Sequence, residues 1–365
     1  FCLSRGLGDV YKRQVVDRTG LPRSVRLRTM ATSATRPATL GSVLQSTDAL
    51  VRMNDAFQPG GLVLEVPAGV HMPAPVVFVH WCDLASTTAP GDQLAPAIFP
   101  RTAVRIGKGA TAQVVEVVAG LPGESPALVV PVTELRVAEG GDLSYVSVQQ
   151  LGPGAWHIAR LAADVGRDAR VRTFTVGLGA AYDRCRTDAV ASGQGALTEL
   201  RSAYFGSDKQ IHDVRTVQEH AAPRTTSDLL CKGAVAQESR SIYSGLIHIR
   251  HGATRSNAMQ TNHNLVLDER AHADSVPNLD IEENDVRCSH ASSVGPIDED
   301  QRYYIESRGI APDRAERLIV LGFFNDIIDR SPVPAATSRL REQIGQRVVR
   351  ALSSQGRKGE IDHDG

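Results

Sequence analysis

A short pattern that recurs along the chain constrains its fold more than any other feature. An aliphatic residue is followed four positions later by a small one, and then by residues that alternate in character. The clearest copies begin at Ile106, Val165, Ile249 and Leu267, and looser copies begin at Val137, Val235 and Ile281. The late copies are spaced by roughly one to two dozen residues, about one coil of a solenoid. The small residue would let the chain turn a corner into a strand with one face in the core. The repeat therefore predicts a β-helix, and a β-sandwich or barrel with irregular hairpins is the alternative.

Short runs rich in aliphatic and β-branched residues support a mostly β fold. They are bounded by Gly, Asp, Pro and Asn, as strands usually are. The runs are Leu62–Val66, Val76–Val79, Val114–Val118, Leu143–Val148, Arg172–Val176, Ile242–Ile249 and Asn264–Leu267. No strong helical stripe lies between them, which disfavours alternating β and α units.

The pattern becomes helical after Gly295. Asp298 and Gln301 have the spacing of a capping box, and Gly309 can end the helix that they begin. Pro312 suits the first turn of the next helix. Apolar residues then recur at helical spacing at Ala315, Leu318, Ile319, Phe323 and Ile327, and again at Leu340, Ile344, Val348 and Leu352. Exposed apolar helix faces would suit a partner-binding module, and the alternative is that these faces pack on one another.

These patterns divide the chain into four parts. Residues 1–14 contain SRGLGDVYKRQ, which resembles the in-frame translation of a transposon-end sequencing adapter and is set aside as an artefact. Residues 15–53 have no stable period, so we expect a linker or the remnant of a truncated N-terminal region, with Met30 as a candidate start. We expect a β-helix core over residues 54–295 and a helical C-terminal domain with a disordered tail over residues 296–365.

Composition narrows the partners and the compartment. The chain has 40 Lys and Arg against 41 Asp and Glu, so its charge gives no reason to expect nucleic acid or an anionic membrane as a partner. No apolar run approaches the length needed to span a bilayer. The five cysteines are far apart and never form a Cys-x-x-Cys pair, which argues against a disulfide framework and a self-contained zinc site. A reducing, cytoplasmic compartment is therefore expected.

The densest set of metal-ligating residue types lies between His212 and His290. Within it, Cys288 and His290 are two residues apart, so on a strand their side chains would project from one face about 7 Å apart. A thiolate and an imidazole so placed could both reach iron or a sulfur-bearing intermediate, and the imidazole could lower the pKa of the thiol. The alternative is a buried cysteine that serves as a small apolar residue.

Acidic residues near this pair could add oxygen ligands, although they would also oppose formation of the thiolate. They are Glu282, Glu283, Asp285, Asp298 and Glu299. His248 and His251 are three residues apart, so on a strand they would lie on opposite faces and should not share a metal. The other cysteines of the β-rich region are expected to be structural. They are Cys82, Cys185 and Cys231.

Motifs of several enzyme classes are missing from the sequence. It has no Gly-x-x-x-x-Gly-Lys-[Ser/Thr] loop, so we expect no ATP binding by this chain. It also lacks a Gly-x-Ser-x-Gly elbow and a His-Glu-x-x-His helix. A stand-alone β-helix enzyme that acts on carbohydrate remains an alternative, but paired carboxylates beside an aromatic sugar platform do not stand out.

Long segments of the chain resemble the SufB/SufD family. The matching phrases are HAAPRTTSDLLCKGAV, SIYSGLIHIRHGATRSNAMQTNHNLVL, VPNLDIEENDVRCSH and VGPIDEDQRYYIESRGI. Upstream, MNDAFQPGGLVLEVPAGVHMPAPVVF resembles the start of the family's core, so the resemblance covers most of residues 54–330. It implies a right-handed parallel β-helix followed by a helical C-terminal region.

The resemblance also implies a non-catalytic scaffold subunit with two kinds of partner. In this family SufB and SufD pair through the ends of their β-helices, and each C-terminal region docks the ATPase SufC. Cys288 and His290 would then hold a transient iron–sulfur cluster, or its iron, at the interface with SufB. A homodimer is the alternative when the chain is alone, and flavin binding is left open. The residues expected to contact SufC are Arg308, Gly309, Ile310, Leu318 and Phe323.

The Cys-Ser-His motif at residues 288–290 matches SufD more than SufB. SufB usually carries a His-Glu pair in this stretch, whereas Ala291 follows His290 here. The chain departs from the usual Gly-Ala-Thr of SufD with Ala291, Ser292 and Ser293. A SufB-like subunit that accepts sulfur is the alternative. It would need a second reactive cysteine within the coils, for which Cys231 is the nearby candidate.

Overall fold

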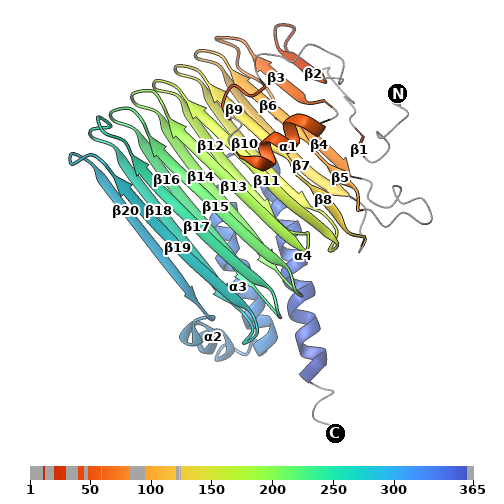
Figure 1. Ribbon diagram of the computed structural model, residues 1–365. Coiled ribbons are helices and arrows are strands. Elements are labelled where there is room, and N and C mark those ends of the chain that lie inside the picture. Colours follow the sequence, from red (N-terminus) through yellow and green to blue (C-terminus); the bar gives the residue numbers. More distant parts are fainter. Residues whose placement is uncertain are drawn as a thin grey trace.

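Two long sheets that face each other make up most of the molecule (Figure 1). The computed structural model describes residues 11–12, 20–29, 40–44, 48–58, 60–82, 95–120, 123 and 125–359. In spatial order, the nine-stranded sheet contains β1 (Tyr11–Lys12), β4 (Val76–Cys82), β7 (Thr111–Gly120), β10 (Asp142–Gln150), β12 (Arg170–Gly177), β14 (Leu197–Gly206), β16 (Thr226–Val235), β18 (Asn257–Val266) and β20 (Arg287–Gly295). The eleven-stranded sheet contains β19 (His272–Ile281), β17 (Arg240–Ile249), β15 (Ile211–His220), β13 (Tyr182–Ala191), β11 (Ala155–Val165), β9 (Val132–Val137), β6 (Arg101–Ile106), β3 (Leu62–Val66) and β2 (Arg26–Thr29), with β5 (Ala97–Ile98) and β8 (Ala127–Val129) beside this path.

The strands are connected as the coils of a solenoid. From β9 onward, successive strands alternate between the two sheets, so each coil adds one strand to each sheet. Neighbouring strands are parallel and in register, as in β14 and β16, where Thr198 lies opposite Ser227. Only β1 and β2 pair antiparallel with their neighbours in the described part of the chain. The fold is a parallel β-solenoid of about seven turns, which confirms the predicted β-helix class.

A row of residues in the left-handed conformation turns the chain from one sheet to the other. Each of them has φ between 51° and 75°: Gly109, Gly140, Asp168, Gly195, Arg224 and Arg255. Each donates its backbone N–H to a carbonyl of the next coil, as Asp168 does to Gln194 at 2.9 Å. Small residues of the sequence repeat lie beside this row and are buried, among them Ala110 and Ala169, whereas Ala271 lies at the opposite corner, before β19. The repeat therefore marks corners between the two sheets.

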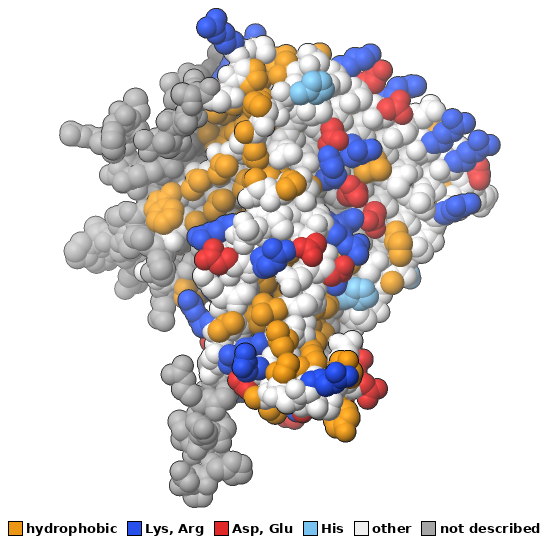
Figure 2. All heavy atoms as spheres, turned by 180° about the vertical axis from the view of Figure 1, so that it is seen from behind, with side chains coloured by type: hydrophobic (Ala, Val, Ile, Leu, Met, Phe, Trp, Pro, Cys, Tyr) orange, Lys and Arg blue, Asp and Glu red, His pale blue; other side chains and the backbone are white. Residues whose placement is uncertain are grey.

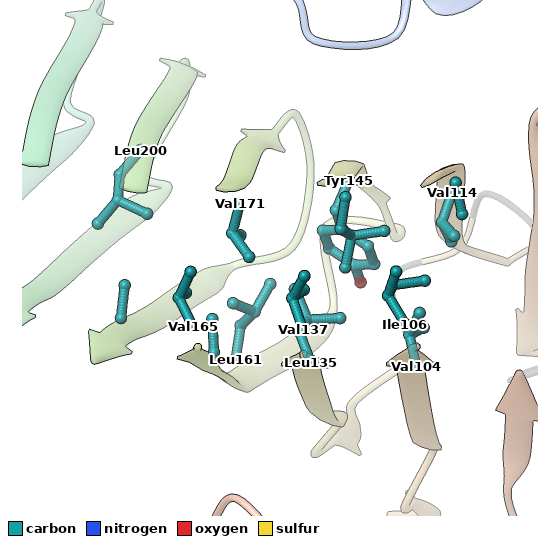
Figure 3. Close-up of a cluster of buried hydrophobic side chains, with 14 of the residues drawn as sticks. Val104, Ile106, Val114, Leu135, Val137, Tyr145, Leu161, Val165, Val171 and Leu200 are labelled. Atoms are coloured by element: carbon teal, nitrogen blue, oxygen red, sulfur yellow. The ribbon is translucent and has the colours of Figure 1, made fainter. Parts of the chain in front are cut away.

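Apolar side chains fill the solenoid near this corner (Figure 3). They come from the inner faces of both sheets and meet between them, because side chains alternate in direction along a strand. The labelled members are Val104, Ile106, Val114, Leu135, Val137, Tyr145, Leu161, Val165, Val171 and Leu200. This core runs along the axis of the solenoid and holds successive coils together.

Helices lie on the outer faces of both sheets in the described part of the chain. α1 (Ala49–Phe57) lies on the eleven-stranded sheet, where Val51 packs on Val132 and Ala162. α3 (Pro312–Ile328) and α4 (Pro334–Gly359) lie behind the nine-stranded sheet, and the short α2 (Glu299–Glu306) precedes them (Figure 1). The apolar faces of α3 and α4 therefore pack on strands as well as on each other. The buried set on this side includes Val146, Phe174, Phe205, Val320, Phe324, Ile344 and Val348.

The helical predictions are confirmed in outline. Asp298 caps α2 by accepting hydrogen bonds from the N–H groups of Asp300 and Gln301, and α3 begins at Pro312. All four residues predicted to form the stripe of α4 are buried. In α3, Ala315 and Ile327 are buried, but Leu318 is half exposed because the face that packs on the sheet is centred on Val320 and Phe324.

The region of residues 15–53, expected to be a linker or the remnant of a truncated N-terminal region, contains regular structure. It contains β2, which pairs antiparallel with β3, and the first residues of α1. β2 is short and most of its side chains are exposed, so its sequence has no hydrophobic periodicity that would predict a strand. The predicted adapter segment lies outside the described residues except for 11–12, and residues 360–365 of the predicted tail lie outside them too.

The outer surface gives no sign of a membrane span. In the part of the chain that the structure describes, no helix has both the length and the apolar character needed to cross a bilayer. Viewed from behind, acidic and basic side chains are interspersed, with apolar side chains gathered between them (Figure 2).

Candidate functional site

Among the described residues, the last coil leaves two strand edges without a neighbouring strand. β20 pairs with β18, and β19 pairs with β17, and each is the last strand of its sheet (Figure 1). Unpaired edges present rows of backbone N–H and C=O groups that can pair with another chain. We call the inner faces of β19 and β20, together with these edges, the open end of the solenoid.

Cys288 and His290 project from one face of β20, as predicted. In the parallel ladder, Cys288 lies opposite Ala258 and His290 lies opposite Gln260. Both partners on β18 are buried inside the solenoid, so the two β20 side chains are on the inner face of the last coil. No further coil covers that face within the described residues. The thiol and the imidazole are therefore placed at the open end.

The two side chains differ in their surroundings. Cys288 is half buried and packs against Ile247, Ile249 and Ala258. Burial raises the pKa of the Cys288 thiol above its usual value, so the thiol stays protonated at neutral pH unless a metal ion displaces its proton. His290 is exposed. The cysteine is therefore held by packing, and the histidine is free to meet a ligand or a partner.

The open end combines apolar and polar surface. Leu279, Ile281 and Val294 are 39%, 42% and 44% exposed, although their positions face inward in the register of the coils. Next to them, the hydroxyl of Ser292 donates to Ser275 at 2.7 Å and bridges the two sheets. An apolar patch with unpaired strand edges is typical of an interaction surface.

A polar layer lies directly below the open end. Asn262 donates to Ser275 at 2.8 Å. The side-chain amide of Gln260 is fully buried, and no hydrogen bond to it is found among the described residues. Buried polar groups are normally satisfied by protein or water. The interior below His290 is therefore polar and suited to bound water.

The acidic residues that were candidate oxygen ligands do not converge on Cys288 and His290. Glu282 faces His248, Glu283 accepts the N–H of Gly252, and Asp285 lies beside Arg255. Asp298 is committed to capping α2. In the described part of the chain, the one group of three or more ligand residues whose ligand atoms all lie within 4.8 Å of one another is His248, Asp280 and Glu282.

The remaining described cysteines lie inside the solenoid. Cys82 and Cys231 are fully buried, and Cys185 lines the interior. Burial raises the pKa of all three thiols to about 12. A thiol with such a pKa is a poor nucleophile at neutral pH, as expected of structural cysteines.

Polar groups inside the solenoid were missed by the sequence patterns. His157 lies 2.7 Å from one carboxylate oxygen of Asp183, and His212 lies 3.3 Å from the other. Nearer the N-terminus, His80 and Tyr145 both hydrogen-bond Glu116. These residues occupy inward positions on separate coils, and the side chains that hydrogen-bond each other are 26 to 36 residues apart in the sequence. Their contacts could have been predicted only from the register of the coils, and that register is known only once every corner has been located in the sequence.

The residues expected to contact SufC lie in and before α3. The guanidinium of Arg308 stacks on the Tyr304 ring at 4.7 Å, and Gly309 ends the turn after α2 with φ of 83°. Ile310 is half buried and Leu318 is half exposed. Phe323 instead packs toward the solenoid, since the ammonium of Lys232 lies 4.6 Å from its ring centre.

Comparison with known proteins identifies the family. Residues 87–323 match the SufBD core domain of SUF system FeS cluster assembly. The chain is 36% identical over 219 residues to an iron–sulfur cluster assembly SufBD family protein of Mycobacterium tuberculosis, an alignment that covers 58% of this chain and 55% of the relative. It is 27% identical over 303 residues to SufD of Bacillus subtilis, covering 82% and 67%. It is 28% identical over 214 residues to SufD of Escherichia coli, covering 59% and 51%.

The chain spans about half the length of the mycobacterial and E. coli relatives that it matches. The match to the core domain nevertheless includes the solenoid from β5 to β20 and most of α3. The resemblance seen in the sequence and the solenoid fold point to the same assignment. The chain belongs to the SufBD family of iron–sulfur cluster assembly proteins.

Proposed function

We propose that this chain is a SufD-like scaffold subunit that holds iron or a nascent iron–sulfur cluster at the seam with a SufB-like subunit. The cluster is cargo in this proposal, to be assembled and passed on. The observation that carries the proposal is the placement of Cys288 and His290 on the inner face of the uncovered last coil. A soft thiolate and an imidazole are both ligands that iron accepts.

The number of donors implies that the site is shared. An iron–sulfur cluster normally takes about four protein ligands, and this face offers two from the present chain. A second solenoid that added its own edge strands to β19 or β20 would satisfy the free backbone groups and cover Leu279 and Ile281. It would also bring further ligands to Cys288 and His290.

The C-terminal helices supply a second surface for a partner. Leu318 is 50% exposed, and Tyr303 and Tyr304 are 73% and 59% exposed. Large aromatic side chains are enriched where proteins bind each other. These residues support docking of a SufC-like ATPase, which would supply the nucleotide hydrolysis that this chain is not expected to perform.

The alternative of a SufB-like, sulfur-accepting subunit has less support. Such a role needs a reactive cysteine within the coils, and Cys231 is fully buried with its pKa raised to about 12. The carbohydrate-enzyme alternative also loses support, because the family to which the chain belongs assembles iron–sulfur clusters.

Reconstitution with the partner subunits tests this proposal. We expect Cys288→Ser and His290→Ala variants to copurify normally with SufB-like and SufC-like subunits but to yield complexes that assemble fewer clusters, measured by the visible absorption of the cluster. The matched control is Ser289→Ala, which changes the residue between them on the opposite face of β20. Wild-type cluster yield from both site variants would show that the assignment is wrong.

A further inference from the structure

The outer face of the last coils carries a second group of metal-ligand residues, separate from Cys288 and His290. β15, β17 and β19 lie side by side at the end of the eleven-stranded sheet (Figure 1). In their register, Glu219, His248 and Asp280 occupy directly paired positions on the three strands. Glu282 is the first residue after β19. Its side chain lies beside the end of β17, because its carboxylate accepts a hydrogen bond from the backbone N–H of His251 at 3.2 Å.

The ligand atoms of three of these residues converge. The Nε2 atom of His248 lies 3.5 Å from Oε1 of Glu282 and 3.9 Å from Oδ2 of Asp280, and all three atoms are within 4.8 Å of one another. Two ligand atoms bound to one ion at about 2.1 Å can be no more than about 4.2 Å apart. The two distances from His248 therefore fit an ion between these side chains.

The fourth residue, Glu219, is placed to orient the imidazole. Its Oε1 atom lies 3.9 Å from Nδ1 of His248, on the side of the ring away from Asp280 and Glu282, and Arg250 forms an ion pair with it. A carboxylate behind a metal-binding histidine commonly fixes its tautomer and the direction of its other nitrogen. Glu219 would act in this way and leave Nε2 directed at the two other carboxylates.

The charges around the group are unbalanced. Within the described residues, the side chain that forms ion pairs with both Asp280 and Glu282 is the same imidazole, which is 25% exposed. Two carboxylates that share one imidazole repel each other at short range, and a divalent cation between them removes that repulsion. One imidazole nitrogen with carboxylate oxygens is a donor set that suits first-row transition metals better than Mg²⁺ or Ca²⁺, which prefer oxygen alone.

We propose that His248, Asp280 and Glu282 bind one divalent first-row transition-metal ion on the outer face of the last two coils. The ion would join β17 to β19 and to the segment that leads into β20. This site does not depend on the proposed role of Cys288 and His290, whose side chains lie on the inner face. Its occupancy would stabilise the end of the solenoid, because an ion that binds only the folded state raises the melting temperature.

Titration of the purified full chain with Co²⁺ alone tests the proposal, with visible absorption and calorimetry as readouts. We expect one equivalent to bind and to raise the melting temperature. His248→Gln, Asp280→Asn and Glu282→Gln should each weaken binding by at least the roughly tenfold loss that removal of an outer-sphere partner causes. All three side chains lie at the surface, and circular dichroism of each variant would verify the fold.

Two controls separate this site from others. His272→Gln removes an exposed histidine on β19 whose Nε2 lies 3.1 Å from Asp274 without a third converging donor, and should leave Co²⁺ binding unchanged. The double variant Cys288→Ser with His290→Ala should also retain it, even if cluster assembly fails. The proposal is wrong if wild-type protein binds no Co²⁺, if the three single variants bind it as wild type does, or if the double variant abolishes binding.

Discussion

Glu116 shows how the solenoid keeps a charge in its interior. Burial alone would raise the pKa of this carboxyl, but the hydrogen bonds and charge of His80, with further hydrogen bonds from Thr102 and Tyr145, lower it to about 2. Thr133 donates a further hydrogen bond at 3.0 Å. The buried carboxylate is therefore ionised in the folded protein at neutral pH, because these partners donate hydrogen bonds to it.

This lowered pKa predicts an acid-dependent loss of stability. A carboxyl whose folded pKa lies below its unfolded value of 4.5 contributes stability above pH 4.5, and that contribution is lost as pH falls toward 2. The full contribution is about 3 kcal/mol. We expect Glu116→Gln to lower the free energy of unfolding at neutral pH, and the difference from wild type to shrink below pH 4.5. Urea denaturation over a pH series measures both.

Glu139→Gln is the matched control. The Glu139 carboxylate is exposed, and within the described residues its ion pair is with Lys108. A surface pair contributes about 0–1 kcal/mol. The free energy of unfolding of the Glu139→Gln protein should therefore depend on pH as that of wild type does. If the Glu116→Gln protein loses the same amount of stability at every pH, the loss would instead indicate a packing defect.

Buried polar residues of this kind also limit what the sequence reveals. β13 and β15 place Asp183, Cys185 and His212 at inward positions and charged residues at outward ones, so neither strand shows an alternation of apolar and polar residues. The run Leu62–Val66 was found in advance because its inward residues, Leu62, Leu64 and Val66, are all aliphatic. For the candidate site, the shared face of Cys288 and His290 followed from their spacing. The exposure of this face could not be predicted from the spacing, because it depends on which coil is the last one.

At the scale of elements, α3 is attached to the solenoid by one lysine as well as by packing. Lys232 projects outward from β16, and its Nζ lies 2.7 Å from Oδ2 of Asp326 and 3.1 Å from the backbone oxygen of Phe323. The same ammonium lies over the Phe323 ring. These contacts lower the pKa of Asp326, chiefly through the hydrogen bond from Lys232. The position of the helix is therefore set by a specific polar contact in addition to its apolar face.

Removing this ammonium should loosen α3. Lys232→Met keeps most of the aliphatic stem but removes the charged hydrogen bonds, and we expect a loss of about 1–2 kcal/mol together with faster amide exchange in α3, measured by hydrogen–deuterium exchange. Arg330→Met is the control, since Arg330 contacts the same Asp326 at 3.0 Å from the turn that follows α3. That exposed pair, four residues apart, contributes only about 0.3–0.5 kcal/mol. Similar rates of amide exchange in α3 in the two variants would show that Lys232 does not hold the helix on the solenoid.

The C-terminal helices also show what an amphipathic pattern can and cannot predict. The stripe from Leu340 to Leu352 located the buried face of α4 correctly. In α3, apolar residues lie on several sides, so periodicity could not decide that Val320 faces the sheet while Leu318 faces solvent. The surface that the helix meets, formed by strands far away in the sequence, makes that choice.

At the scale of the whole molecule, stability should fall toward the open end. In a solenoid each coil is held by its two neighbours, whereas β19 and β20 have one neighbouring coil and exposed apolar residues on their inner faces. We expect amides of β19 and β20 to exchange faster than those of β12 and β14, measured by hydrogen–deuterium exchange on the isolated chain. Addition of a SufB-like subunit should slow exchange at β19 and β20 specifically. Uniform protection along the solenoid before and after addition would count against both expectations.

The in-register ladders restrict how the length of such a chain can change during evolution. Deleting one residue near the start of β14 would turn Leu200 and Tyr204 outward and would bring outward residues such as Arg201 into the core. Insertions and deletions should therefore be confined to the corners, or should add or remove an entire coil. Homologues of this protein are expected to differ in the number of their coils more than in the length of their strands.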